Sequence, residues 1–244
     1  MSFANPRPEN PASKFIDYKG DTGKFQHYQK PEAEGQEGKN IVIKLPIKFI
    51  VIDELSTIAG FNDAFQTGVY SNEVHRPKEI LHVRLFTKKD SPLNKEISKM
   101  GCIGTYAEIK GDIKSLGGKY AKSVYALINN NGAAELVNFK VKGSFLNAWI
   151  ESGINTDRDG ILIKECIQKK KGTNTYFEPV IEPFEITDKE KTQKIARKYY
   201  DLLQKYFEQR KNYTDEQVIV EEETKTEFNE EGDFQASTDS DLPF

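Results

Sequence analysis

The stretch Ile41-Val42-Ile43-Lys44-Leu45-Pro46-Ile47-Lys48-Phe49-Ile50-Val51-Ile52 decides the fold class of this 244-residue chain. Every odd-numbered position from Ile41 to Val51 is apolar, whereas Lys44 and Lys48 fall on the other face. This period of two predicts a β-strand that buries one face. The lysines and Pro46 also keep the run short of the roughly 18 apolar residues that a membrane span requires, so we expect no membrane partner.

Segments that follow this stretch predict further strands and three helices. Alternating or β-rich patterns predict strands at residues 81–88, 119–128, 136–141, 161–168 and 176–181. Helical spacing predicts helices at residues 105–116, 144–151 and 187–211. The last helix opens with the capping box Thr187-Asp188-Lys189-Glu190, and its buried stripe is formed by Ile195, Tyr199, Leu202 and Tyr206. Residues 57–77 receive no assignment, and the chain is expected to be mainly β, of the α+β class.

Residues 1–40 differ from the rest in composition and are expected to form an N-terminal arm. Breakers of regular structure occur in it at Pro6, Pro8, Pro11 and Pro31. Its middle part interleaves lysines with Phe15, Tyr18, Phe25 and Tyr28, around the turn Gly20-Asp21-Thr22-Gly23. This pattern predicts a short hairpin that is both aromatic and basic.

The residue types that commonly carry catalysis or bind metals form no recognisable group in this sequence. Cys102 and Cys166 form no Cys-x-x-Cys pair, and the three histidines lie at no zinc-ligand spacing. There is no phosphate-binding loop, nucleophile elbow or metalloprotease motif. We therefore expect no enzyme activity, no catalytic residue, no metal site and no cofactor. The unpaired cysteines and the lack of a signal pattern favour a cytoplasmic location, in the host cell if the protein is viral.

The net charge of −3 conceals a strong asymmetry along the chain. The segment from Asp215 to Phe244 holds eleven acidic residues and one lysine, a net charge of −10. The preceding part must then carry +7 to give the total of −3. A basic body with an acidic tail predicts a polyanionic partner for the body and a separate, basic partner for the tail.

The tail is expected to be disordered from residue 213 to residue 244, because it is acidic and has no periodicity. It ends in Asp239-Ser240-Asp241-Leu242-Pro243-Phe244, which places an apolar tip and a free carboxylate on a flexible anionic segment. A purely solvating tail has no use for such a tip. We therefore predict that Asp239, Asp241, Leu242, Pro243 and Phe244 dock on a partner protein.

This hexapeptide resembles the acidic tip, ending in Pro-Phe, of bacterial single-stranded DNA-binding proteins and of their phage counterparts. The resemblance implies that the tip recruits replication and repair proteins and competes with DNA for the binding groove. The bacterial proteins combine a smaller DNA-binding domain with a long linker rich in Gly, Gln and Pro, so the phage type fits this chain better. A second resemblance, to phage-encoded proteins of similar length that are associated with single-stranded DNA binding, is carried by Asn10-Pro11, by Lys14-Phe15-Ile16 and the run to Tyr28, and by residues 118–125.

Binding of single strands without sequence preference requires aromatic rings for the bases and cations for the phosphates. The residues that combine these properties are Lys24, Phe25, Tyr28, Lys30, Arg84, Phe86, Lys88, Lys119, Tyr120, Lys122, Tyr125 and Lys170. Tyr120 and Lys122 share one face of a strand whereas Tyr125 lies on the other. Either the first two line a groove while Tyr125 packs inside, or the arrangement is reversed.

Together these observations predict an oligonucleotide-binding fold, a partly open five-stranded barrel with added helices and a disordered acidic tail. The expected organisation is an arm at 1–40, a DNA-binding body at 41–212 and the tail at 213–244. The expected function is to coat single-stranded DNA during phage replication or recombination. A strand-annealing protein and a DNA-mimicking inhibitor remain as alternatives, and the open edges of such a barrel also permit a homodimer.

Overall fold

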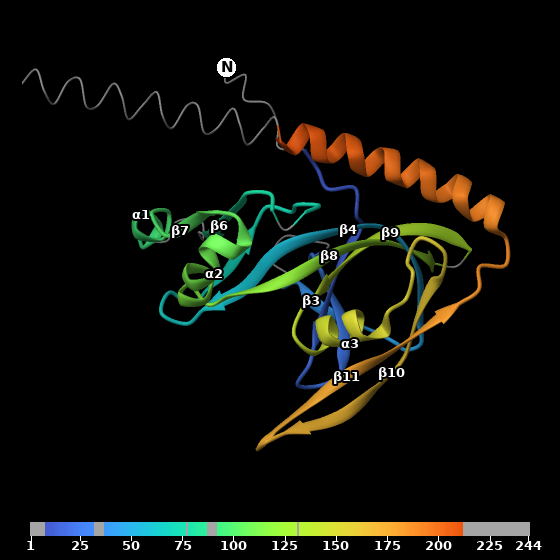
Figure 1. The fold of residues 1–244 in the computed structure, drawn as a ribbon, viewed down its shortest axis with the longest axis horizontal. Coiled ribbons are helices and arrows are strands. Elements are labelled where there is room, and N and C mark those ends of the chain that lie inside the picture. The colour runs from blue at the N-terminus through green and yellow to red at the C-terminus, as the bar shows by residue number, and fades with distance from the viewer. Residues whose placement is uncertain (1–7, 32–36, 77, 87–91, 131, 212–244) are drawn as a thin grey trace, which may run out of the picture. The chain divides into compact units, whose positions relative to one another are not determined.

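The computed structural model describes residues 8–31, 37–76, 78–86, 92–130 and 132–211 (Figure 1). The chain divides into two units, one formed by Ala12–Tyr199 and the other by Met1–Pro11 together with Tyr200–Phe244. The tail predicted at 213–244, with its docking residues Asp239, Asp241, Leu242, Pro243 and Phe244, lies outside the described residues.

A single sheet of eleven strands makes up most of the first unit, which confirms the prediction of a mainly β protein. The strands are β1 (Lys14–Lys19), β2 (Lys24–Gln29), β3 (Lys39–Ile43), β4 (Ile47–Asn62), β5 (Thr67–Ser71), β6 (Leu81–Leu85), β7 (Gly101–Gly104), β8 (Gly118–Asn130), β9 (Ala133–Val141), β10 (Gly160–Lys171) and β11 (Asn174–Phe184). Their order is β3-β2-β1-β9-β8-β4-β5-β6-β7, and β10 joins β4 to β11. The sheet thus contains more strands than the five predicted, and among the described strands no pairing closes it into a ring.

The stretch predicted as one strand at 41–52 forms parts of two. Proline has no N–H for the ladder, so Pro46 separates β3 from β4. β3 pairs with β2, whereas β4 pairs with β8 along most of its length and with β10 at its start. The far end of β4 pairs with β5, so this 16-residue strand links both halves of the sheet.

The predicted aromatic hairpin is present, but it is not a separate arm. β1 and β2 are antiparallel and joined by the turn at residues 20–23. β1 also pairs in parallel with β9, with Ile16 opposite Phe139. The hairpin therefore belongs to the main sheet, and the boundary expected at residue 40 falls inside β3.

Two hydrophobic cores lie on one face of this sheet. The first core joins strands β1, β2, β4, β8, β9 and β10 to helix α3 (Ser144–Ser152). Its buried side chains include Phe25, Phe49, Val124, Phe139, Phe145 and Trp149. Figure 1 shows α3 within the curl of these strands. The second core joins the end of β4 and strands β5–β7 to α1 (Asn94–Ile97) and α2 (Tyr106–Ser115). Each core therefore supports one half of the sheet.

The last helix spans residues 189–211. Its cap is Asp188, whose carboxylate accepts a hydrogen bond from the N–H of Lys191 at 3.0 Å, so it begins one residue later than the predicted capping box implies. The predicted stripe is wrong at one position, because Leu202 is exposed while Leu203 is buried. None of the helices in the described part of the chain is long and apolar enough to cross a bilayer.

Candidate nucleic-acid interface

Strand register assigns every side chain of the sheet to one of two faces. Successive residues of a strand alternate between faces, and directly paired residues share one. Val124 and Phe139, which pair with each other, mark the core face. On the opposite face, pairing places Lys119, Ala59, Tyr70 and Arg84 in one row across β8, β4, β5 and β6.

Three aromatic side chains are exposed on this opposite face, over the second core. The exposed fraction is 50% for Phe61, 44% for Tyr70 and 55% for Phe86. Arg84 and Lys119 are exposed beside them. We call these five residues the aromatic face. Its position follows from β6, in which Leu81, Val83 and Leu85 are buried in the second core, so that Arg84 is directed to the other side.

Gly68 forms a gap at the centre of the aromatic face. It pairs with Phe61 on one side, and on the other its carbonyl accepts a hydrogen bond from the N–H of Phe86 at 2.8 Å. A side chain added at Gly68 would meet open space. Two aromatic rings therefore stand two strand spacings apart, roughly 9 to 10 Å, and of the residues that the structure describes only the backbone of Gly68 lies between them.

The backbone under Phe61 is held by a close approach between β4 and the start of β8. The N–H of Phe61 donates to the carbonyl oxygen of Gly117 at 3.3 Å. A Cβ atom at Gly60 would collide with that same oxygen. Gly117 itself has a φ of +82°, in the region that favours glycine. These glycines fix the position of the β4 end that carries Phe61.

The structure brings together three of the sequence-predicted residues, Arg84, Phe86 and Lys119. It adds Phe61 and Tyr70, which the sequence analysis missed because both lie in the unassigned region 57–77. No local pattern marked them, because the part of β4 beyond Ile52 shows no regular alternation. Lys88, the remaining residue predicted for this region, lies outside the described residues.

Phe25 and Tyr125 were wrongly predicted to contact DNA, because both side chains are buried. The Phe25 ring packs in the first core, with its centroid 4.7 Å from that of Tyr18 and 5.2 Å from that of Phe145. Tyr125 lies on the other face of the sheet, where its hydroxyl donates to Glu73 at 3.1 Å. Neither ring offers a free face to a base.

Tyr120 and Lys122 share a face, as predicted, but it is the core face and both have protein partners. The Tyr120 hydroxyl is hydrogen-bonded to the Ser56 hydroxyl at 2.7 Å. Lys122 forms an ion pair with Glu54, which also accepts a hydrogen bond from the indole N–H of Trp149 at 2.9 Å. The charge of Lys122 is thus compensated inside the protein. The burial of Tyr125 excludes the alternative that placed this ring in the groove and agrees with the one that packs it inside. Contact of Tyr120 and Lys122 with DNA stays a prediction.

The other predicted cations and Tyr28 are exposed at separate places in the sheet. Lys24 and Tyr28 lie on β2, and Lys30 follows that strand. Lys170 lies near the tip of the β10–β11 hairpin, where Lys171 is also exposed. Beside it, Lys169 forms an ion pair with Glu178. Among the described residues no carboxylate forms an ion pair with Lys170 or Lys171, so the hairpin tip presents positive charge.

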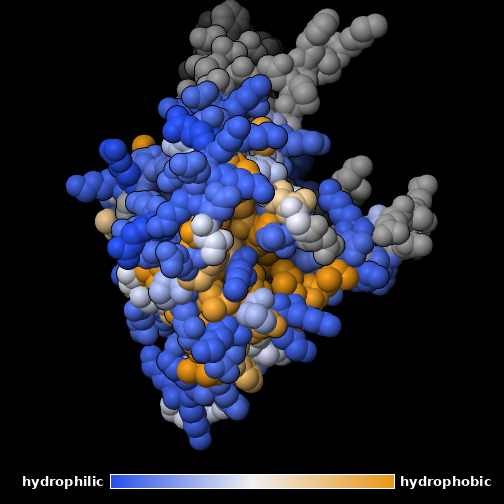
Figure 2. All heavy atoms as spheres, turned by 90° about the vertical axis from the view of Figure 1, so that its right-hand side faces the viewer, coloured by the Kyte–Doolittle hydropathy of each residue, from blue (hydrophilic) through white to orange (hydrophobic). Residues whose placement is uncertain are grey.

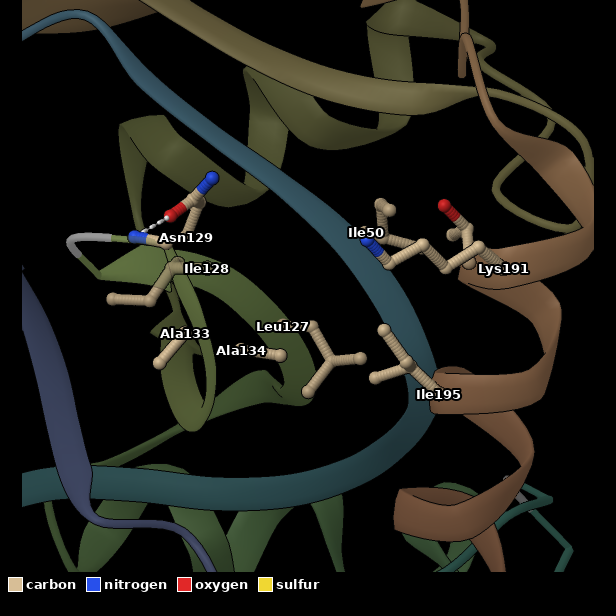
Figure 3. A pocket seen from close by; sticks show the side chains of 10 residues that line it. Ile50, Leu127, Ile128, Asn129, Ala133, Ala134, Lys191 and Ile195 are labelled. Atoms are coloured by element: carbon tan, nitrogen blue, oxygen red, sulfur yellow. Dashed lines mark hydrogen bonds between the residues drawn. The ribbon is translucent and has the colours of Figure 1, made fainter.

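An apolar pocket lies between β4, the β8–β9 hairpin and the start of the last helix. Its lining includes Ile50, Leu127, Ile128, Ala133 and Ile195, with Lys191 at its margin, and its volume is about 230 Å³. Figure 3 shows the side chains of Leu127 and Ile195 reaching toward each other. Figure 2 shows apolar side chains gathered in a hollow with hydrophilic ones around it. The pocket is smaller than the roughly 300 Å³ at which small-molecule sites begin, and it carries few polar groups.

Both cysteines are free and half-buried. Burial is the main cause that raises the pKa of the Cys102 and Cys166 thiols. A raised pKa keeps a thiol protonated and weakly nucleophilic at neutral pH. Their environment is therefore that of structural residues.

Comparisons with known proteins identified no relative of this chain. No protein-family model matches the sequence, and no curated protein or solved structure is significantly similar to the chain. The aromatic face, with its exposed rings and cations, is the surface from which a function can be argued.

Proposed function

We propose that this protein binds single-stranded DNA without sequence preference and that the aromatic face is its principal contact surface. The observation that carries the proposal is the presence of Phe61, Tyr70 and Phe86 on one sheet face with Arg84 and Lys119 between and beside them. Exposed rings stabilise unpaired bases by about 1 to 3 kcal/mol each, and every base has a face to stack.

The arrangement suits a single strand better than a duplex. Bases in a duplex are stacked on each other and present only their edges, whereas a single strand can place its bases on protein rings. The gap at Gly68 leaves the rings of Phe61 and Phe86 accessible from the side. Arg84 and Lys119 lie in the row that contains Tyr70, where they can pair with phosphates of the same strand.

The oligonucleotide-binding fold is part of this proposal, and the chain connectivity supports it. Strands β4, β8, β9, β10 and β11 occur in this order along the chain, with β5–β7 between the first and the second and α3 between the third and the fourth. The first of them pairs with both the second and the fourth. This resembles a five-stranded Greek-key barrel left open between β9 and β11, where β1 pairs with β9 instead.

In barrels of this type, the connections between the first and second strands and between the fourth and fifth bind oligonucleotides. Here the aromatic face is built mainly on the long first connection, which contains β5, β6 and β7. Lys170 and Lys171 lie on the second, at the β10–β11 tip. Both cationic regions thus stand where such a barrel would hold its ligand.

In the proposed role the protein coats exposed single strands during phage DNA replication or recombination. The acidic tail, ending in Leu242-Pro243-Phe244, recruits replication or repair proteins. The test is a fluorescence titration of labelled oligo-dT with the full chain, beside a duplex of equal length. Preferential binding of the single strand supports the proposal. Equal affinity for the duplex, or no binding at micromolar protein concentration, would contradict it.

Salt should weaken binding steeply, and two charges of the aromatic face should contribute to the slope. Phosphate contacts release counterions, so each contact adds roughly 0.7 to the slope of log affinity against log salt for a single strand. Arg84→Ala and Lys119→Ala should each lower that slope by about this amount, measured by titration at several salt concentrations. Lys99→Ala, which removes an exposed lysine outside the aromatic face, is the control. Unchanged slopes in both variants would contradict phosphate contact at these positions.

The tail should act on DNA affinity and on partner binding through different residues. Deleting Asp215–Phe244 removes a net charge of −10 and should tighten oligo-dT binding at low salt, because an anionic segment competes for a cationic surface. Deleting Phe244 alone should leave DNA affinity within about twofold but abolish capture of replication proteins from a host extract. Equal DNA affinity with and without the tail would show that it does not compete.

A further inference from the structure

A second group of exposed aromatic side chains lies on the same sheet face, on β1 and β2. Phe15 is 53% and Tyr28 60% exposed. Because Ile16 pairs with His27, Phe15 and Tyr28 are cross-strand neighbours. Phe15 also pairs with Asn138 of β9, which places it on the side opposite the first core. We call Phe15, Tyr28 and the exposed Lys24 the hairpin face.

Lysines outnumber carboxylates on the described strands β1 and β2. Asp17 is the acidic residue on this part of β1, and its carboxylate lies 3.1 Å from the amines of both Lys19 and Lys142. The two lysines therefore outweigh the negative charge of Asp17. Lys24 adds a further cation on β2. Two exposed rings on strands that also carry exposed lysines combine the same residue types as the aromatic face.

A buried polar centre separates the hairpin face from the aromatic face. Ser123, Tyr125 and Asn138 lie between them on β8 and β9, and all three are buried. Ser123 and Tyr125 both donate hydrogen bonds to the carboxylate of Glu73. From β1 to β5 the sheet has four strand spacings, which amount to roughly 19 Å across the strands. The two faces are also offset along the strands, because Phe15 lies in the row of Tyr125 and Tyr70 in the row of Lys119. A mononucleotide at one face therefore cannot touch the other.

We propose that the hairpin face is a second contact site for the same DNA strand that binds the aromatic face. The proposal rests on the proposed function and names the ligand more closely, as an oligonucleotide long enough to bridge both faces. Linking two contacts through one strand makes the second binding event intramolecular, which raises the overall affinity by up to about 10² to 10⁴. Affinity should therefore rise sharply at the length that first spans the two faces.

The experiment compares binding of oligo-dT by the full chain and by the Phe15→Ala/Tyr28→Ala double variant. The oligonucleotides increase in length from about 6 to about 30 nucleotides, so that the shortest can occupy only one binding site. Wild type should show a step in affinity with length. The double variant should lose the step and bind the longest oligonucleotide about tenfold or more weakly, while binding of the shortest one is unchanged. Phe15→Tyr/Tyr28→Phe keeps both rings and should behave as wild type.

The outcomes separate this inference from the proposed function. No binding of any length by wild type would overturn the proposed function itself. Binding by wild type that the double variant reproduces at every length would overturn only the second site. A shift of the double variant to a smaller assembly in light scattering, with unchanged DNA affinity, would identify the hairpin face as an interface between copies instead. If the variant does not fold, a long oligonucleotide is photo-crosslinked to wild type instead. Labelling of both the peptide with Tyr28 and the peptide with Tyr70 supports the second site, and labelling of the Tyr70 peptide alone contradicts it.

Discussion

Replacing Phe61, Tyr70 and Phe86 together by alanine is expected to weaken binding of oligo-dT by at least about 100-fold. Each ring contributes about 1 to 3 kcal/mol when a base stacks on it, and 1.4 kcal/mol is a tenfold change in affinity. The cations of the face, Arg84 and Lys119, remain in this variant, so weak and salt-sensitive binding should persist. The measurement is the titration of fluorescent oligo-dT at low salt.

Two controls make this result specific. The three rings are 44% to 55% exposed, so their removal should change the free energy of unfolding by no more than about 0.5 kcal/mol per site. A thermal melt of the variant checks this. Tyr200→Ala removes a tyrosine of similar exposure from the last helix and should leave affinity within about twofold. Affinity of the triple variant equal to wild type would move the DNA contact away from the aromatic face.

Phe25→Ala should have the largest effect on stability, although the sequence suggested a DNA contact at this position. The Phe25 ring is buried among Tyr18, Phe139 and Phe145. Truncating a buried phenylalanine costs about 3 to 5 kcal/mol, through lost transfer energy and the cavity left behind. For a chain of this size the melting temperature should fall by roughly 6 to 20 °C.

The measurement is urea denaturation followed by circular dichroism, with DNA titration of the variant at a temperature where it is folded. Tyr28→Ala, on the same strand but exposed, is the matched control and should change the free energy of unfolding by about 0.5 kcal/mol or less. A Phe25→Ala variant that melts like wild type but binds DNA poorly would contradict the burial of this ring.

The two faces together suggest how one sheet can hold a flexible strand. The aromatic face stands on the second core and the hairpin face on strands that border the first, so each is supported by its own packed layer. Both belong to one hydrogen-bonded sheet. A ligand that bends between them would bind more tightly than either face allows alone.

Local patterns in the sequence were sufficient to place several elements and one part of the site. The mainly β character and the β1–β2 hairpin follow from residues that are close in sequence. The direction of Arg84 also follows, because Leu81, Val83 and Leu85 must share the opposite side of the same strand. The extent of β4 was not predicted, because its second half, Thr57 to Asn62, contains Gly60 and lacks a simple alternation.

Within a regular strand such as β6, the period of two along the chain is therefore enough to establish which residues share a face. In β4 a bulge between Val51 and Asp53 shifts this period, which the sequence did not reveal. The sequence also did not determine which face would be covered. Tyr125 is buried although it lies opposite the first core, and Phe25 is buried although Lys24 directly precedes it. Phe61, Tyr70 and Lys119 are neighbours only in the folded protein, because pairing of β4 with β5 and β8 brings them together. They are up to about 60 positions apart in the chain, and no local pattern relates them.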